Sequence, residues 1–124
     1  MAKAKKLTAR KLADLVVREV EDIKGRDVVC LDVKKLTSVT DFLVIATGSS
    51  SRHVKAVAET AVEKLKEQGH RPSGIEGLEA GEWVLVDFGD VVLHVLNEQA
   101  RALYALEKLW SGVPEKQDRS EVAD

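Results

Sequence analysis

The chain of 124 residues lacks the features that cross-link a protein or carry it through a membrane. It has one cysteine, Cys30, which excludes an internal disulfide and any zinc site built on paired cysteines. No apolar run approaches the ~20 residues that span a bilayer, so we expect a cytoplasmic protein without membrane contact. The net charge of −2 argues against a domain that depends mainly on phosphate contacts for binding.

With 44% hydrophobic residues, the sequence has enough apolar surface for one domain of its own. Helical and alternating apolar patterns follow each other along the chain, which is typical of the α/β class. We therefore predict a single α/β domain with a mixed β-sheet and packed helices. The strands are expected over 27–33 and 41–48, around 73–75 at an edge, and in a hairpin over 82–97.

Three helices follow from apolar residues at helical spacing. The first, over 8–24, is expected to stop at Gly25, and the second begins at one of the serines 49–51, any of which can cap it. Asn97 caps a third helix over 98–110. The expected inner face of this last helix consists of Ala100, Leu103, Leu106 and Trp110.

The hairpin EWVLVDFGDVVLHVLN (82–97) has two unlike faces. If Gly89-Asp90 is a two-residue turn, Val86 lies opposite Leu93 on a face that is wholly apolar and must meet the core. The other face pairs Asp87 with Val92, Leu85 with His94, and Trp83 with Leu96. Either a helix covers this mixed face, or Trp83 and its neighbours are partly exposed as a docking surface built around an aromatic anchor.

An active site is a further alternative. Asp32, Asp41, Asp87 and Asp90 could hold magnesium, and Gly48-Ser49 before a helix could bind phosphate. Metal-dependent nucleotidyl transfer, however, sets two carboxylates at i and i+2 of one strand, and no expected strand contains such a pair.

The other candidate catalytic groups are scattered. The three histidines fall on separate elements, and Cys30 is expected to be a buried, inert strand thiol. At the start of the second helix, Arg52, His53 and Lys55 are read either as solvated residues or as anion contacts.

Two long segments, LTSVTDFLVIATGSSSRHVKAVAE (36–59) and GEWVLVDFGDVVLHVLNEQARALYALEKLW (81–110), closely resemble the ribosomal silencing factor family, also called Iojap-related proteins. The resemblance covers about residues 8–111 as one domain, and we expect a disordered tail over 112–124. It implies a nucleotidyltransferase-like fold without catalytic carboxylates. It also implies that the protein is no enzyme and uses neither a metal nor another cofactor.

The resemblance further implies a repressor of translation that binds the large ribosomal subunit through its protein fourteen and blocks joining of the small subunit. Relatives of this kind are often homodimers when free, and organelle relatives take part in large-subunit biogenesis. The contact residues expected here are Trp83, Leu85, Asp87, His94 and Tyr104. The basic N-terminus, with Lys3, Lys5 and Lys6, could also touch ribosomal RNA. The alternative function is a small nucleotidyltransferase-like or phosphate-binding enzyme.

Overall fold

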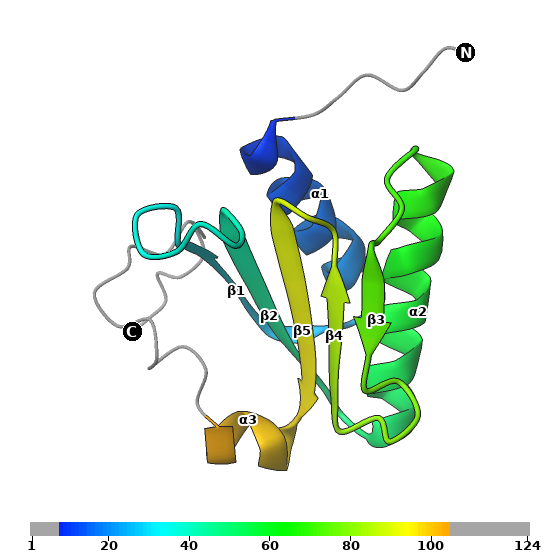
Figure 1. The fold of residues 1–124 in the computed structure, drawn as a ribbon. Helices are drawn as coiled ribbons and strands as arrows, with labels where there is room; N and C mark the ends of the chain where they lie inside the picture. Colours follow the sequence, from blue (N-terminus) through cyan, green and yellow to red (C-terminus); the bar gives the residue numbers. More distant parts are fainter. Residues whose placement is uncertain (1–7, 105–124) are drawn as a thin grey trace.

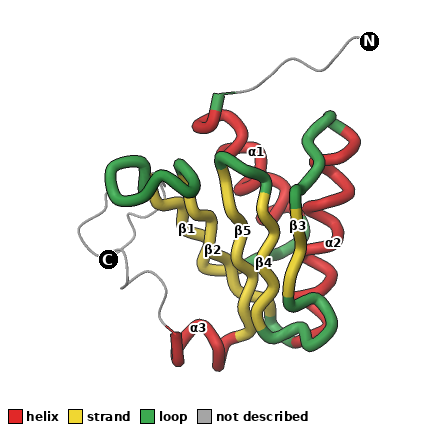
Figure 2. The backbone as a smooth tube through the Cα atoms, in the orientation of Figure 1, coloured by secondary structure: helices red, strands yellow, loops and turns green. Residues whose placement is uncertain are grey.

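The computed structural model describes residues 8–104, which form one five-stranded sheet and three helices (Figures 1 and 2). Every expected element within this range is present, with ends that differ by a few residues. The predicted α/β class and mixed sheet are confirmed. In chain order the elements are α1 (Ala9–Asp22), β1 (Arg26–Asp32), β2 (Phe42–Gly48), α2 (Ser51–Glu67), β3 (Gly74–Glu76), β4 (Trp83–Asp87), β5 (Val91–Asn97) and α3 (Glu98–Tyr104).

The strands lie in the order β1-β2-β5-β4-β3. The central pair, β2 and β5, is parallel, whereas the three other pairs are antiparallel. All seven residues of β2 are buried, as expected for a central strand with a continuous apolar run. The hairpin therefore lies at the centre of the sheet, because β5 is the neighbour of β2.

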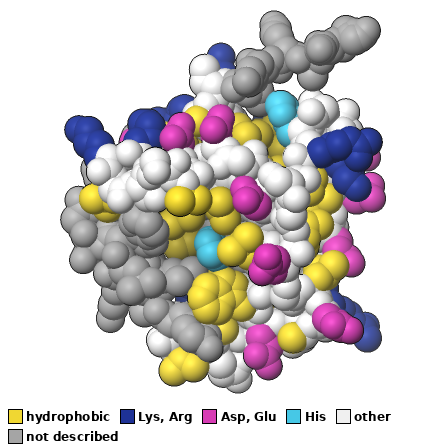
Figure 3. Space-filling model, in the orientation of Figure 1, with side chains coloured by type: hydrophobic (Ala, Val, Ile, Leu, Met, Phe, Trp, Pro, Cys, Tyr) yellow, Lys and Arg dark blue, Asp and Glu magenta, His cyan; other side chains and the backbone are white. Residues whose placement is uncertain are grey.

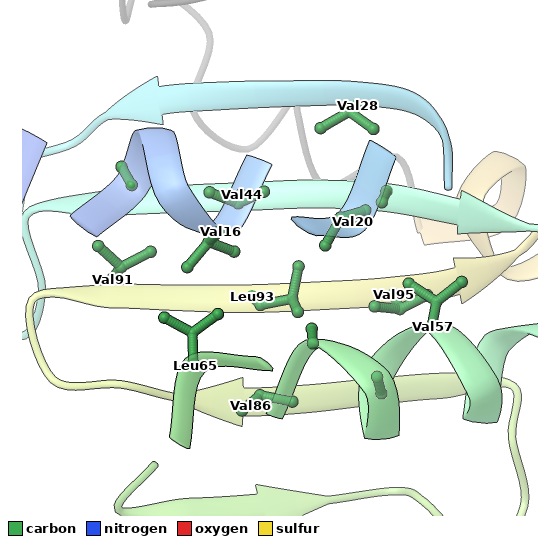
Figure 4. Packing of buried hydrophobic residues seen from close by; sticks show 14 of the residues in the cluster. Val16, Val20, Val28, Val44, Val57, Leu65, Val86, Val91, Leu93 and Val95 are labelled. Carbon is green, nitrogen blue, oxygen red and sulfur yellow. The ribbon is translucent and has the colours of Figure 1, made fainter. Parts of the chain in front are cut away.

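Helices α1 and α2 pack side by side on one face of the sheet. Figure 4 shows their inward side chains, such as Val16 and Val57, meeting Val44, Leu93 and Val95 from the strands. A second, smaller cluster lies on the opposite face, where α3 contacts β5 and β2. The two faces of the sheet are thus covered by helices to different extents, since both longer helices pack on the same face.

Helix α1 ends at Asp22, close to the stop predicted at Gly25. The left-handed residue at this end is Lys24 (φ 70°). Gly25 donates its N–H to the carbonyl of Val20, and glycine is required there because a Cβ would come within 2.4 Å of the Val20 side chain. The glycine therefore allows a close approach of the chain to the helix that it leaves.

The last helix differs from its expected packing. Asn97 caps α3, since its side-chain oxygen accepts a hydrogen bond from the Ala100 N–H at 2.8 Å, and Ala100 is buried as predicted. Leu103, predicted to face inward, is instead 75% exposed. The helical spacing was read over a segment whose second half, including Leu106, Trp110 and the expected tail over 112–124, lies outside the described residues.

Within residues 8–104, no helix is both long and apolar enough to cross a membrane. Cys30 is buried in β1, as the strand pattern predicted.

Candidate functional site

The turn of the hairpin is the tight one that the sequence indicated. Phe88 donates its N–H to the Val91 carbonyl, and Gly89 at φ 92° takes the left-handed conformation that such turns require. The Asp87 carboxylate accepts the Gly89 N–H at 2.8 Å. Asp87 therefore stabilises the turn, and one of its oxygens is held in place.

The register of the hairpin is confirmed, and with it the two faces. Val84 and Val86 are fully buried against the α1 and α2 side. Trp83, Leu85 and Asp87 point to the opposite side and are half-buried. In Figure 3, hydrophobic side chains gather over β4 and β5 around one histidine, with acidic side chains beside them. We call Trp83, Leu85, Asp87 and His94 the hairpin patch.

Within the hairpin patch, Trp83 and His94 are joined directly. The indole Nε1–H of Trp83 donates to Nδ1 of His94 at 3.0 Å, and the two rings are tilted by 49°. Reasoning from the sequence missed this hydrogen bond, although the predicted register already places the two residues close together. Trp83 lies opposite Leu96 and His94 opposite Leu85, so the two rings are diagonal neighbours, a distance that aromatic side chains can bridge.

His94 is the most buried member of the hairpin patch, with 9% of its surface exposed. Burial lowers the pKa of the imidazole from 6.5 to about 4, because the charged form loses its hydration. The ring is therefore neutral at physiological pH. It can accept one hydrogen bond and donate another, but it carries no charge to a partner.

The fifth expected contact residue, Tyr104, is the last residue of α3, and its side chain lies outside the described part of the structure. The structure therefore brings together Trp83, Leu85, Asp87 and His94 on one side of the sheet, and says nothing of the tyrosine ring.

The alternative phosphate site at Gly48-Ser49 is occupied by the protein itself. The Ser49 N–H donates to Nδ1 of His53 at 2.8 Å, and Nε2 of the same ring lies 3.1 Å from the Ile23 carbonyl. A Cβ at Gly48 would come within 2.7 Å of the Val54 side chain. The glycine thus lets the strand pack on α2, and His53 is held between two backbone groups instead of being available to an anion.

The alternative metal site does not assemble among residues 8–104, where no three His, Cys, Asp or Glu side chains lie close enough to hold an ion. The Asp32 carboxylate accepts the Lys34 N–H and pairs with the Lys34 ammonium at 3.4 Å, so it stabilises the chain where it leaves β1. A cavity of about 430 Å³ lies elsewhere, between α2 and β3, with Glu59, Val62 and Ile75 in its wall. It includes none of the residues of the alternative phosphate site.

Comparison with known proteins identifies the family of the chain. A family model described as "Ribosomal silencing factor during starvation" matches residues 6–124. The chain belongs to this family. The family is not a known class of enzyme, and its description refers to ribosomal silencing.

Individual relatives agree with this assignment. The chain is 48% identical over 103 residues to the "Ribosomal silencing factor RsfS" of Chromobacterium violaceum, a match that covers 83% of this chain and 84% of that protein. It is also 35% identical over 101 residues to "Mitochondrial assembly of ribosomal large subunit protein 1" of Mus musculus, a match that covers 79% of this chain and 44% of the mouse protein. Of these two names, that of the mouse protein refers to the large ribosomal subunit.

Solved structures extend the likeness to the fold. A crystal structure of a Chromobacterium violaceum protein, 47% identical, superposes with a TM-score of 0.83 and covers 86% of this chain and 88% of that one. A crystal structure from Bacillus halodurans, 40% identical, has a TM-score of 0.78 and covers 87% of this chain and 98% of that one. The fold described above is therefore the fold of its experimentally solved relatives.

Proposed function

We propose that the protein represses translation by docking the hairpin patch on protein fourteen of the large ribosomal subunit, which blocks joining of the small subunit. The observation that carries this proposal is Trp83, a half-buried tryptophan on the sheet face opposite α1 and α2. Membership of a family named for ribosomal silencing supports a ribosomal partner. The name of the mouse relative supports the large subunit.

The hairpin patch has the make-up of a protein-binding surface. Trp83 and Leu85 offer apolar area that a partner can bury further, and a fully buried side chain of this size contributes roughly 1.5–3 kcal/mol. Tryptophan is among the residues most enriched at the energetic centres of interfaces. Asp87, held by the Gly89 N–H, presents a fixed negative charge that favours a basic group on the partner and improves orientation and on-rate.

The mechanism is steric exclusion, so it requires tight binding and bulk but no reaction. We propose accordingly that the protein is not an enzyme and needs no cofactor. It acts in the cytoplasm and is a homodimer when free. Analytical ultracentrifugation of the free protein tests the dimer.

The test is co-sedimentation with purified large subunits, followed by addition of small subunits. The parent protein should sediment with large subunits and lower the joined fraction. Trp83→Ala and Asp87→Arg should each weaken binding at least about tenfold, the effect expected at an energetic centre of an interface. Glu63→Arg on α2, which makes the same charge change away from the hairpin patch, is the matched control and should bind like the parent. Folded Trp83→Ala and Asp87→Arg variants that bind like the parent would contradict the proposal.

Ribosomal RNA is a second proposed partner, reached by Lys3, Lys5 and Lys6, which lie outside the described residues. Removing lysines that neutralise phosphates should lower the salt dependence of binding, because fewer counterions are released. A triple Lys→Gln variant should therefore show a shallower dependence of affinity on salt. An unchanged slope would contradict contact between these lysines and ribosomal RNA.

A further inference from the structure

His94, the most buried residue of the hairpin patch, has a defined protonation state. An indole N–H can only donate, so the 3.0 Å hydrogen bond from Trp83 Nε1 requires an unprotonated Nδ1 on His94. The proton of the neutral ring is then on Nε2. With 9% of its surface exposed, His94 offers little area to a partner, whereas the half-buried Trp83 offers more.

The neutral state of this ring is set by burial. Its pKa of about 4 has desolvation as its cause. The charged groups on this side of the sheet include Asp87 from β4, Glu76 from β3, which lies opposite Leu85, and Arg101 from α3. Arg26 of β1, opposite Thr47, is paired with Glu98. Asp87 binds the Gly89 N–H, and Arg101 donates to the Thr47 hydroxyl at 2.7 Å. The β2 residue opposite His94 is Ile45, which does not titrate.

We propose that His94 is a positioning residue of the docking surface, which acts through Trp83 by accepting its indole N–H and fixing the orientation of the ring. The inference rests on the proposed function, since it explains how the tryptophan is prepared for its partner. An aromatic anchor that is already ordered loses less conformational entropy on binding, so a preorganised Trp83 binds more tightly. This role differs from the direct contact that the family resemblance led us to expect of the histidine.

Two substitutions separate the hydrogen bond from the bulk of the ring. Asparagine places its side-chain oxygen close to the position of Nδ1 and keeps an acceptor for the indole. Phenylalanine keeps a flat ring of similar size but accepts no such bond. Trp83→Phe removes the donor from the other side. All variants are made in a Trp110→Phe background, because the sequence has two tryptophans and the emission should report on Trp83 alone.

The first measurement is large-subunit affinity by co-sedimentation. His94→Phe should weaken binding about five- to tenfold, the usual effect of removing one hydrogen bond, and His94→Asn should stay within about twofold of the parent. In the Trp83→Phe background, His94→Phe should have almost no further effect. Equal affinity of His94→Phe and the parent, or an undiminished effect in the Trp83→Phe background, would overturn the positioning role.

The second measurement needs no ribosome. The Trp83 emission of the parent should change with a midpoint near pH 4, where Nδ1 becomes protonated, while circular dichroism follows the fold. His94→Asn should lack this transition. A transition shared by both proteins would contradict the inference. If the parent fails to bind subunits but shows the transition, the proposed function is wrong while the coupling of the two rings stands.

Discussion

Gly77 offers a sharp test of how the backbone under Trp83 is built. It lies in the loop between β3 and β4 at φ 84°, and a Cβ there would come within 2.1 Å of the Trp83 carbonyl oxygen. Because the obstacle is backbone, no side-chain rotation can relieve it. Gly77→Ala must therefore displace either its own loop or the start of β4.

Two other glycines separate the cost of backbone strain from the cost of steric overlap. Gly89→Ala has the same conformational problem (φ 92°) but open space around the new methyl, so it should cost about 1–2 kcal/mol of unfolding free energy. Gly74→Ala meets nothing within 4 Å and has no positive φ, so it should change stability by less than about 0.5 kcal/mol. Gly77→Ala combines strain with overpacking of about 1–3 kcal/mol and should lose roughly 2–5 kcal/mol.

Urea unfolding of the three variants measures these differences. The expected order of unfolding free energies is Gly74→Ala, then Gly89→Ala, then Gly77→Ala as the least stable. Since Gly77 lies against the Trp83 backbone, its variant should also weaken large-subunit binding more than the Gly89 variant does. If Gly77→Ala proves no less stable than Gly89→Ala, the close backbone approach at Trp83 is not a real constraint, and the reasoning fails.

Two more predictions concern single side chains. Ser50→Ala should lose about 1 kcal/mol of unfolding free energy, because the Ser50 hydroxyl accepts the His53 N–H at the start of α2. Ser51→Ala should have a smaller effect. Equal losses of the two variants in denaturant titrations would contradict the assignment of the cap. For His94, the folded pKa of about 4 lies below the ordinary 6.5, so the unfolded chain takes up the proton first as the pH falls. Stability from this group is therefore full above pH 6.5 and declines toward pH 4 by up to roughly 3 kcal/mol. The decline should be missing from the stability curve of His94→Phe, and a parallel pH dependence of both proteins would refute it.

Local rules were sufficient for most of the fold. A glycine at the first position of a two-residue turn determined the register of the hairpin, and that register correctly assigned Val86 and Trp83 to opposite faces. The alternating and helical spacings of apolar residues predicted where strands and helices lie, because elements such as α1, α2 and β4 each bury one apolar face. The continuous apolar run of β2 likewise predicted its central place.

The errors arose where the result depends on three-dimensional packing. The sequence pattern could not show that Leu103 lies on the exposed side of α3, since that depends on how the helix leaves β5. Nor could it show that Gly25 packs on Val20. The Trp83–His94 hydrogen bond could have been predicted from the hairpin register. That would have required considering diagonal residue pairs in addition to the directly opposite ones.

The parallel pairing of β2 with β5 has a consequence for how the chain acquires its structure. Phe42 pairs with Val91, so α2, β3 and β4 must all be made before the central strand arrives. Until then both β2 and β4 have open edges, which are prone to join other chains. Folding therefore requires pairing between segments that are far apart in sequence, which lowers the folding rate. A nascent chain on the ribosome cannot complete its core until β5 has emerged from the exit tunnel.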